Sequence, residues 1–279
     1  MPVISDWLKL ATQRLKYVDI PSARLDAELI LAHTLRKSRT YLHAHIDQSL
    51  TARELEIAEA RLALRIDRVP VAYIIGHKEF YGRLFQVTTA TLIPRPESET
   101  MIELLKELVQ LTPPRLLTAP HLRLIDVGTG SGCLGITAKL ELPELDVTLA
   151  DISRHALAIA TKNSQRLHAD TTVLQSDLLI NYPFEADFIL ANLPYVDRSW
   201  DTPPELEHEP ALALYADDDG LHLIKKIIQQ ANTGLTPGGH LLLEADTSQL
   251  DAISHFALAH GFIETARRGF IICLKRRET

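Results

Sequence analysis

From residue 122 onward, short apolar runs typical of strands alternate with patterns typical of amphipathic helices. The expected strands lie at 122–127, 147–151, 171–177, 187–194, 238–245 and 270–274, and the expected helices at 133–140, 153–168, 220–233 and 248–260. Parallel strands need long crossover connections, usually helices, so the alternation predicts an α/β fold with a mostly parallel sheet and helices on both faces. Ligands bind such sheets beyond the carboxyl ends of the strands, which makes the residues after each strand candidates for a site.

The first 75 residues have a different composition. All 12 glycines lie from Gly76 onward, and the residues before it carry apolar side chains at helical spacing. Three main helices are expected, around 4–15, 25–32 and 55–66. Thr51 and Glu54 form a capping-box pattern just before the third of these helices.

The chain of 279 residues is long enough for about two domains. Between Gly76 and Ala90, apolar and aromatic residues alternate with polar ones, which predicts a β-hairpin. We therefore expect an N-terminal helical domain at 1–75, a β-hairpin linker at 76–90 and a larger catalytic domain at 91–279.

The net charge of −7 disfavours a protein that holds nucleic acid mainly through phosphate contacts. The charge is unevenly distributed, because residues 1–90 carry 13 basic and 10 acidic side chains whereas the rest carries 16 and 26. The small domain could therefore contact an acidic partner, although a solvated helical surface explains the same charges.

Cys133 and Cys273 are the only cysteines, and no group of cysteines and histidines has the spacing of metal ligands. Neither a disulfide framework nor a bound metal is expected. The N-terminus has no secretory pattern, and no apolar run approaches the ~18 residues of a membrane span. We expect a cytoplasmic protein without a membrane partner.

A glycine-rich turn follows the first strand of the larger domain. Asp126 opens the pattern D-x-G-x-G-x-G, which ends at Gly132 where a helix begins. Glycines let the backbone approach a ligand closely, and the next strand ends in Asp151, whose carboxylate can accept hydrogen bonds from both hydroxyls of a ribose. A nucleoside-containing cofactor is predicted. Because residues 130–135 also fit G-x-G-x-x-G, a nicotinamide dehydrogenase remains an alternative.

Two strands later the chain reads Asn192-Leu193-Pro194-Tyr195. Together with Asp126, Asp151 and Asp177, this segment is similar in order and spacing to S-adenosylmethionine-dependent methyltransferases that act on planar nitrogens. Further stretches narrow the resemblance: PSARLDAELILAHTL, GHKEFYG, TLIPRPESE and LEHEPALALYADDDGL resemble the protein-(glutamine-N5) methyltransferases of peptide chain release factors. The resemblance covers nearly the whole chain.

The resemblance implies a Rossmann-like class I methyltransferase sheet with one antiparallel strand, S-adenosyl-L-methionine as cofactor, and a release factor as protein substrate. It implies that a Gly-Gly-Gln loop is the target and that the N-terminal helices dock the substrate. The residues expected to cradle the methionine part are Gly128, Thr129, Gly130, Ser131 and Gly132. Asp151 is expected to hold the ribose, Asp177 and Leu178 to border the adenine, and Asn192 to border both ligands. No direct nucleic-acid contact is expected, and we expect a monomer.

An amide nitrogen is a poor nucleophile because its lone pair is delocalised into the carbonyl group. Acceptors that hold both N–H bonds can turn the lone pair toward the sulfonium methyl group, which converts binding energy into alignment. The Asn192 side chain and the Leu193 carbonyl are the expected acceptors, Pro194 biases Leu193 toward an extended conformation, and Tyr195 is expected to stack on the flat amide. No catalytic base is nominated.

The chain departs from the family pattern at two positions. Leu193 stands where most members have proline, which leaves the backbone carbonyl in place but removes rigidity. Leu178 stands where a bulkier or aromatic residue is common, so it can pack against adenine without a stacking ring. A cofactor-binding relative that lacks turnover is one alternative function, and adenine-N6 methylation of DNA or RNA is another.

Several of these residues also have purely structural explanations. Asn and Pro after a strand often make a turn, and Asp177 could cap the turn that follows it. Arg95, Glu97 and Glu99 could simply flank a helix start. We expect the acidic run 217–219 to be a solvated helix start, and we assign no metal to residues 207–209.

Overall fold

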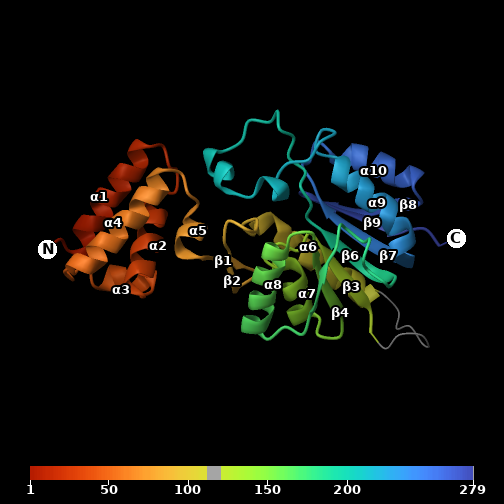
Figure 1. The fold of residues 1–279 in the computed structure, drawn as a ribbon, viewed down its shortest axis with the longest axis horizontal. Helices are drawn as coiled ribbons and strands as arrows, with labels where there is room; N and C mark the ends of the chain where they lie inside the picture. Colours follow the sequence, from red (N-terminus) through yellow and green to blue (C-terminus); the bar gives the residue numbers. More distant parts are fainter. Residues whose placement is uncertain (112–120, 279) are drawn as a thin grey trace. The chain divides into compact units, whose positions relative to one another are not determined.

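The computed structural model describes residues 1–111 and 121–278 (Figure 1). The chain forms two compact units, which are described separately. Unit 1 consists of residues 1–77 together with the short segment 203–208, and unit 2 consists of 78–202 and 209–279. The chain thus leaves unit 2 once, contributes six residues to unit 1, and returns.

Unit 1 is helical. Its helices are α1 (Ile4–Tyr17), α2 (Ala23–Leu35), α3 (Arg39–Ala44), α4 (Ala52–Ile66) and α5 (Val71–Ile75). The three expected helices are confirmed as α1, α2 and α4, and the short α3 and α5 are additional. The capping box is also confirmed, because the Glu54 N–H donates to Thr51 Oγ1 and the Thr51 N–H donates to the Glu54 carboxylate. Trp7, Leu31 and Leu62 belong to the shared apolar core of this unit.

A buried ion pair fastens the segment 203–208 to unit 1. Arg65 of α4 is only 5% exposed, and its Nε donates to Asp26 of α2 at 2.7 Å. Both terminal nitrogens of the same guanidinium donate to Glu205 at 3.1 Å. One buried cation therefore joins two helices and the 3-10 helix Pro204–His208.

A hairpin of β1 (His77–Phe80) and β2 (Arg83–Gln86) opens unit 2 from Lys78 onward, as the sequence predicts for this region. Phe80 and Phe85 are buried and meet edge to face, so the hairpin packs into the core of this unit. The side-chain amide of Asn163 exchanges two hydrogen bonds with the backbone of Gln86. After the hairpin come the 3-10 turn Pro96–Ser98 and helix α6 (Glu99–Leu111).

Within the described residues, seven strands form the main sheet of unit 2 in the order β5-β4-β3-β6-β7-β9-β8. They are β3 (Arg123–Val127), β4 (Asp146–Asp151), β5 (Thr172–Gln175), β6 (Ala186–Ala191), β7 (Leu235–Glu244), β8 (Phe262–Arg268) and β9 (Ile271–Arg276). Strand β9 pairs antiparallel with both neighbours, whereas the other pairings are parallel. The expected mostly parallel sheet with one antiparallel strand is confirmed.

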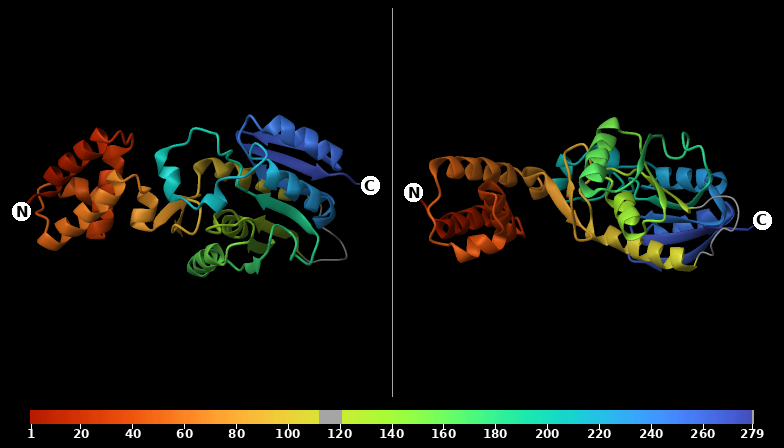
Figure 2. Two further views of the ribbon diagram at one scale, coloured as in Figure 1. Left: turned by 45° about the horizontal axis from the view of Figure 1, so that its top comes forward. Right: turned by 90° about the horizontal axis from the view of Figure 1, so that it is seen from below.

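Helices cover both faces of this sheet (Figures 1 and 2). They are α7 (Cys133–Glu141), α8 (Arg154–Leu167), α9 (His222–Gly234) and α10 (Leu250–Ala259), in addition to α6. Alternate strand residues enter two cores, since Leu124 and Phe188 pack with α6 and α7 whereas Ile125 and Ile189 pack with α9 and α10. This two-sided burial explains why the strands are apolar without interruption.

In unit 2, one strand and one long helix were not predicted from the sequence. Strand β8 is mostly exposed and carries Glu264, Arg267 and Arg268, so it lacks the apolar run by which the buried strands were found. Helix α6 has a clear apolar face, but only the residues at its start were considered as a helix signal.

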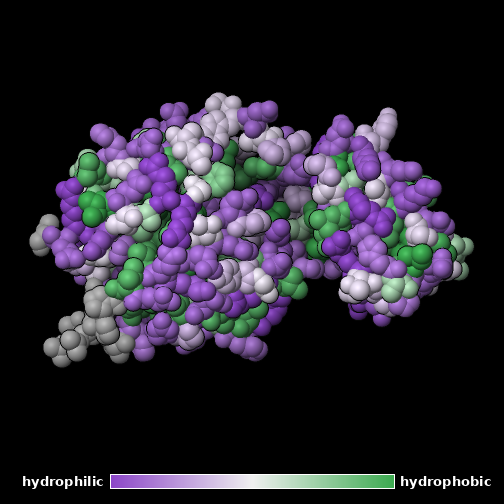
Figure 3. Space-filling model, turned by 180° about the vertical axis from the view of Figure 1, so that it is seen from behind, coloured by the Kyte–Doolittle hydropathy of each residue, from purple (hydrophilic) through white to green (hydrophobic). Residues whose placement is uncertain are grey.

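No helix in the described residues is long and apolar enough to cross a membrane. On the face shown in Figure 3, hydrophilic side chains cover most of each unit, and hydrophobic ones occur in small groups. Cys133 and Cys273 are both free thiols.

Candidate active site

The carboxyl ends of β3, β4 and β6 meet at a cavity of about 210 Å³ in unit 2. The chain crosses from β3 to β4 on one side and reaches β6 on the other, so the order of strands reverses here, which is where open α/β sheets bind ligands. Val127 is in register with both Ala150 and Ala191. The residues after these three strands therefore start at the same level of the sheet.

The cavity wall includes most of the residues that the sequence indicated. These are Gly128, Thr129, Gly130, Ser131, Asp151, Asp177, Leu178, Asn192, Leu193 and Pro194. Gly132 and Tyr195 do not line it: Gly132 is the residue that precedes α7, and Tyr195 packs against the apolar core beside α9 and α10. The wall also contains the segments 90–95 and 210–213, to which no chemistry was assigned from the sequence.

The glycine turn is held from beneath by Asp126. This carboxylate is 1% exposed and accepts hydrogen bonds from Thr129 Oγ1 at 2.6 Å and from the Gly135 N–H at 2.9 Å. Burial raises the pKa of Asp126 to about 6, against the effect of these two donors. Asp126 therefore shapes the turn without lining the cavity.

Gly128 shows why the turn needs glycine. Its φ of +72° is unfavourable for other residues, and a Cβ placed there would lie 3.0 Å from Leu193 Cδ2. The Leu193 side chain is buried in the core and packs directly against the turn. Leu193, in place of the proline of the family pattern, thus places an aliphatic side chain against the glycine turn after β3.

Asp151 projects into the cavity from the end of β4. Its Oδ2 accepts from the Gly130 N–H at 2.9 Å and its Oδ1 from the Ser153 N–H at 2.8 Å, which fixes the carboxylate relative to the glycine turn. Burial raises the pKa of Asp151, and backbone donors from Ser153, Gly130 and Ile152 oppose that shift. A carboxylate has about four acceptor positions, so these donors do not exhaust its capacity to accept.

Apolar side chains continue the wall beside Asp151. Ile152 lines the cavity although it is 53% exposed, and Leu178 lies in the wall at 7% exposure. Leu178 has a φ of +53°, a conformation that bulky residues rarely adopt. Asp177 also lines the cavity, and its Oδ2 accepts a hydrogen bond from Lys226 Nζ at 2.8 Å. Ile152 was not predicted as a site residue, because a single apolar residue after a strand forms no recognisable sequence motif.

The Asn192 amide is oriented by residues from two other elements. Its Nδ2 donates to Ser98 Oγ at 3.2 Å, and Ser98 Oγ donates to Glu244 Oε2. Ser98 ends the 3-10 turn before α6, and Glu244 is the last residue of β7. Because the amide nitrogen is engaged, Oδ1 is the atom left to accept, and no donor within the described part of the chain bonds to it. We call Asn192, Ser98 and Glu244 the amide relay.

Glu244 is a buried carboxyl group, 2% exposed, that the sequence did not single out. Burial raises its pKa, while hydrogen bonds from Ser98, Asn192 and Tyr195 oppose the shift. The Tyr195 hydroxyl lies 3.4 Å from Glu244 Oε1, and burial followed by the charge of Glu244 raises the pKa of this tyrosine. Glu244 could not be found from the sequence because its partners lie about 50 and 146 residues away.

The backbone after Asn192 is tied to a loop before α9. Gln249 Nε2 donates to the carbonyls of Tyr195 at 2.9 Å and Asp219 at 2.7 Å. A Cβ on Gly220 would lie 2.0 Å from the Tyr195 carbonyl oxygen, so only glycine permits this approach. The acidic run 217–219 lies in the turn before α9, separated from the helix by Gly220 and Leu221, and two of its residues have positive φ.

Glu209 joins two of the unassigned wall segments. Its carboxylate accepts from the Ile93 N–H at 3.0 Å and from Arg95 at 2.5 Å. Glu209 is buried and Arg95 is about one-third exposed. Arg95 and Glu209 therefore form an ion pair with a structural role. Among residues 1–111 and 121–278, no group of side chains that could hold a metal ion occurs.

Comparisons with known proteins match both parts of the chain. A family model described as the PrmC N-terminal domain matches residues 6–76, and one described as the methyltransferase small domain matches residues 108–208. A methyltransferase from Pyrococcus furiosus superposes with a TM-score of 0.52 over 78% of this chain and 98% of that chain. At 16% sequence identity this likeness supports the class I methyltransferase fold alone.

Two curated relatives extend over most of the chain. The bifunctional methyltransferase of Rickettsia felis is 31% identical over 93% of this chain, which spans 54% of that protein. The release factor glutamine methyltransferase of Koribacter versatilis is 39% identical, over 87% of this chain and 86% of that protein. With that identity across nearly the full length of both proteins, the chain belongs to the family of release factor glutamine methyltransferases.

Proposed function

We propose that this chain transfers a methyl group from S-adenosyl-L-methionine to the side-chain amide nitrogen of the glutamine in the Gly-Gly-Gln loop of peptide chain release factors. The observation that carries the proposal is the amide relay, which leaves Asn192 Oδ1 as an acceptor in the wall of a cavity that also contains Asp151. An oxygen acceptor is what an amide N–H needs. The names of the curated relatives support the same substrate.

The cavity wall fits the proposed cofactor. Gly128, Thr129 and Gly130 line the cavity, so the backbone of the glycine turn would lie beside the methionine part. Asp151 would accept from the ribose hydroxyls, and Ile152 and Leu178 would flank the adenine as apolar walls. Asp177 would border the adenine edge. When bound, the cofactor supplies an electrophilic methyl group on a positively charged sulfur, which is a good leaving group.

Alignment is the main contribution of the protein. Asn192 Oδ1 and the Leu193 carbonyl would each accept one N–H of the glutamine amide, so that the nitrogen lone pair faces the methyl group. The relay prevents the Asn192 amide from turning its NH2 group toward the substrate. Pro194 keeps Leu193 extended, which holds the second acceptor in place.

A catalytic base is not required by this arrangement. Holding reactants in a near-attack geometry contributes about 7–11 kcal/mol, and the proton can leave after methyl transfer, when the nitrogen has become acidic. Burial raises the pKa of the Cys133 thiol in the cavity wall to about 12, so this group is not a nucleophile at neutral pH. Tyr195 as a stacking partner remains a prediction, because its ring packs outside the cavity wall.

The N-terminal unit would dock the protein substrate. One glutamine side chain offers too little area for specific recognition of a large protein, which needs roughly 800 Å² per partner. Residues 6–76 match a domain model of the same family, which supports a role in that family's shared reaction. The partner would be a release factor rather than a nucleic acid or a membrane.

Methyl transfer to a release factor tests the proposal. The full chain is incubated with labelled cofactor and a release factor, and mass spectrometry locates the added methyl group. We expect it on the glutamine of the Gly-Gly-Gln loop. Asn192→Ala should lower kcat/KM at least about 100-fold, because misaligned reactants lose that much rate. The matched control is Asn232→Ala, which removes an exposed asparagine of α9 outside the cavity wall.

Other outcomes would identify the alternatives. Salt-sensitive methylation of oligonucleotides, with the release factor unmodified, would indicate an adenine methyltransferase. Binding of cofactor and release factor without transfer would indicate a relative that has lost turnover. Selective binding of a nicotinamide dinucleotide would contradict the whole proposal.

A further inference from the structure

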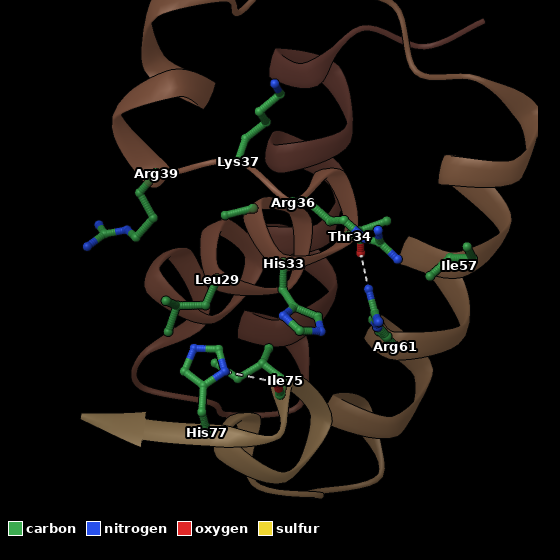
Figure 4. Close-up of a pocket in the computed structure, with 11 residues that line it drawn as sticks. Leu29, His33, Thr34, Arg36, Lys37, Arg39, Ile57, Arg61, Ile75 and His77 are labelled. Atoms are coloured by element: carbon green, nitrogen blue, oxygen red, sulfur yellow. Dashed lines mark hydrogen bonds between the residues drawn. The ribbon is translucent and has the colours of Figure 1, made fainter. Parts of the chain in front are cut away.

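Unit 1 contains a second cavity, of about 590 Å³, that the proposed reaction does not use. Cationic and imidazole side chains occupy much of its wall, and we call it the cationic pocket: it is lined by Leu29, Ala32, His33, Thr34, Arg36, Lys37, Arg39, Ile57, Arg61, Ile75 and His77. All of these residues belong to unit 1. They come from α2, α3, α4 and α5, from residues 36 and 37 after α2, and from His77 at the start of β1 (Figure 4).

The positive charge of this pocket is poorly balanced. No carboxylate lines it. Arg39 has a partner in Glu28, at 2.6 Å. In contrast, no ion pair to Arg36, Lys37 or Arg61 occurs in the described part of the chain. A concave wall with several uncompensated cations concentrates a positive potential, even though the chain as a whole carries a charge of −7.

Arg61 is the most informative of these cations. It lies in the middle of α4, half-buried, and its Nη1 donates to Thr34 Oγ1 at 2.9 Å. That bond, drawn in Figure 4, holds the guanidinium at the pocket, and no other hydrogen bond from Arg61 occurs in the described part of the chain. Burial lowers the pKa of Arg61, which reflects a charge that lacks a compensating anion.

Two imidazoles face each other beside Arg61. The rings of His33 and His77 have centroids 5.9 Å apart, and His77 Nδ1 lies 3.0 Å from the Ile75 carbonyl. Burial lowers the pKa of His33, and the charges of Arg61, His77 and Arg36 lower it further. The remaining charged residues in the pocket wall, Lys37 and Arg39, are also positively charged.

The end of a helix explains only part of this cluster. Cations near the C-terminus of α2 complement its dipole, and His33, Arg36 and Lys37 lie there. Arg61 is in the interior of α4, and His77 begins β1. Residues from three separate segments therefore bring their donors to one hollow, which a dipole effect at α2 does not require.

We infer that the cationic pocket binds a small molecule that carries a phosphate group on an apolar body. The guanidinium groups of Arg36 and Arg61 present planar donors that match a phosphate. Lys37 contributes positive charge from further away, because its Nζ lies 5.0 Å from the centre of the Tyr41 ring. The volume lies within the range of roughly 300–1,000 Å³ typical of small-molecule sites. The apolar part of the wall is formed by Leu29, Ile57 and Ile75. A bare ion would not pack against these side chains, whereas the apolar body of a ligand would. The inference does not depend on methyl transfer.

A pair of probes that share the anion tests this inference. Calorimetry on the full chain compares inorganic phosphate with phenyl phosphate at one ionic strength. We expect phenyl phosphate to bind more tightly, and Arg61→Gln to weaken its binding at least about tenfold, because one charge-assisted contact is lost. The matched control is Arg53→Gln, which removes an exposed arginine of the same helix away from the pocket and should leave binding unchanged.

A second measurement does not rely on the variant. In the NMR titration of the imidazoles, bound phenyl phosphate should raise the pKa of His33, because an anion offsets the nearby cations. No binding of phenyl phosphate at millimolar concentration, or equal binding by wild type and Arg61→Gln, would overturn the proposal. Binding of a polyglutamate peptide that depends on Arg61, without binding of phenyl phosphate, would also overturn it and assign the pocket to an acidic protein segment.

Discussion

At the scale of single residues, the site depends on which atom of Asn192 faces the cavity. An asparagine can present either a carbonyl oxygen or an NH2 group, and only the oxygen can accept from a glutamine amide. Ser98 and Glu244 decide between them, because an ionised carboxylate accepts hydrogen bonds and cannot donate. A buried carboxyl group that receives three side-chain bonds is therefore a positioning residue for the proposed reaction.

This role predicts a pH dependence. The pKa of Glu244 is raised, so the rate of methyl transfer should fall as the pH drops through that raised value and the carboxyl group becomes protonated. Glu244→Gln should remove this acidic limb from the profile of kcat against pH. It should also lower kcat about tenfold, the equivalent of ~1.4 kcal/mol, with little change in cofactor affinity. A variant with an unchanged profile would show that Glu244 does not control the relay.

Asp126 predicts a pH dependence of stability instead. Its pKa is about 6 in the folded chain, above its usual value, so the folded state holds the proton more tightly. The stabilisation from that proton is complete at low pH and is lost as the pH rises to about 6 and beyond. Between pH 4.5 and 7, wild type should lose about 2 kcal/mol of unfolding free energy relative to Asp126→Asn. Urea titrations at both pH values measure this, and parallel curves would argue against a raised pKa.

At the scale of elements, the loops after the strands are fixed by close backbone approaches. Gly220 lies beneath the Tyr195 carbonyl, and Gln249 ties the same carbonyl to Asp219. The order of strands brings the β3 turn and the Asn192 segment together, but these contacts determine how far the segment extends over the cavity.

A matched pair of glycine variants separates conformation from contact. Gly220 and Gly269 both have positive φ, but a Cβ meets the Tyr195 carbonyl in the first case and nothing within 4 Å in the second. Gly220→Ala should therefore destabilise the chain by ~1–3 kcal/mol more than Gly269→Ala, which is the usual cost of overpacking. It should also lower methyl transfer, since the Asn192 segment must move. Equal effects of the two substitutions on unfolding would exclude the contact as the cause.

At the scale of the whole molecule, the division into units does not follow the sequence. Residues 203–208 belong to unit 1 although their neighbours on both sides belong to unit 2. Several contacts hold this segment in unit 1: the buried Arg65 donates to both Asp26 and Glu205, Arg68 also donates to Glu205, and His208 Nε2 lies 3.0 Å from the Asp67 carbonyl. A single domain boundary in the sequence therefore cannot describe the two units, because unit 1 contains two separate segments of the chain.

Removing Glu205 should release this segment. In Glu205→Ala, Arg65 keeps Asp26 and the Val69 carbonyl but loses its bond to the segment, so amide hydrogen exchange in 204–208 should become faster while the sheet of unit 2 is unaffected. Glu207→Ala is the control, because Glu207 is exposed and has no ion pair among the described residues. Hydrogen exchange read by mass spectrometry measures both variants. Equal protection of the segment in both would show that the ion pair does not hold it.

The sequence by itself determined most of the strands and main helices, and it located the loops after the strands that form part of the cavity wall. Apolar alternation and helical spacing act between near neighbours along the chain, which is why the strands, the hairpin and the main helices could be predicted. The residues after β3, β4 and β6 could be named as a site because parallel strands end at the same edge. Strand β8 escaped prediction because an exposed edge strand need not be apolar.

Only the tertiary structure decided how the polar atoms are used. Three buried polar residues have hydrogen-bond partners far away in the sequence: Glu244, Ser98 and Glu209. A hydrogen bond between distant residues produces no periodic pattern in the sequence, so it could not be predicted. The cationic pocket has the same origin, since helix packing brings Arg61 to His33 and His77. Local patterns fix secondary structure because their interactions are local, whereas a binding site is made by side chains that only packing brings together.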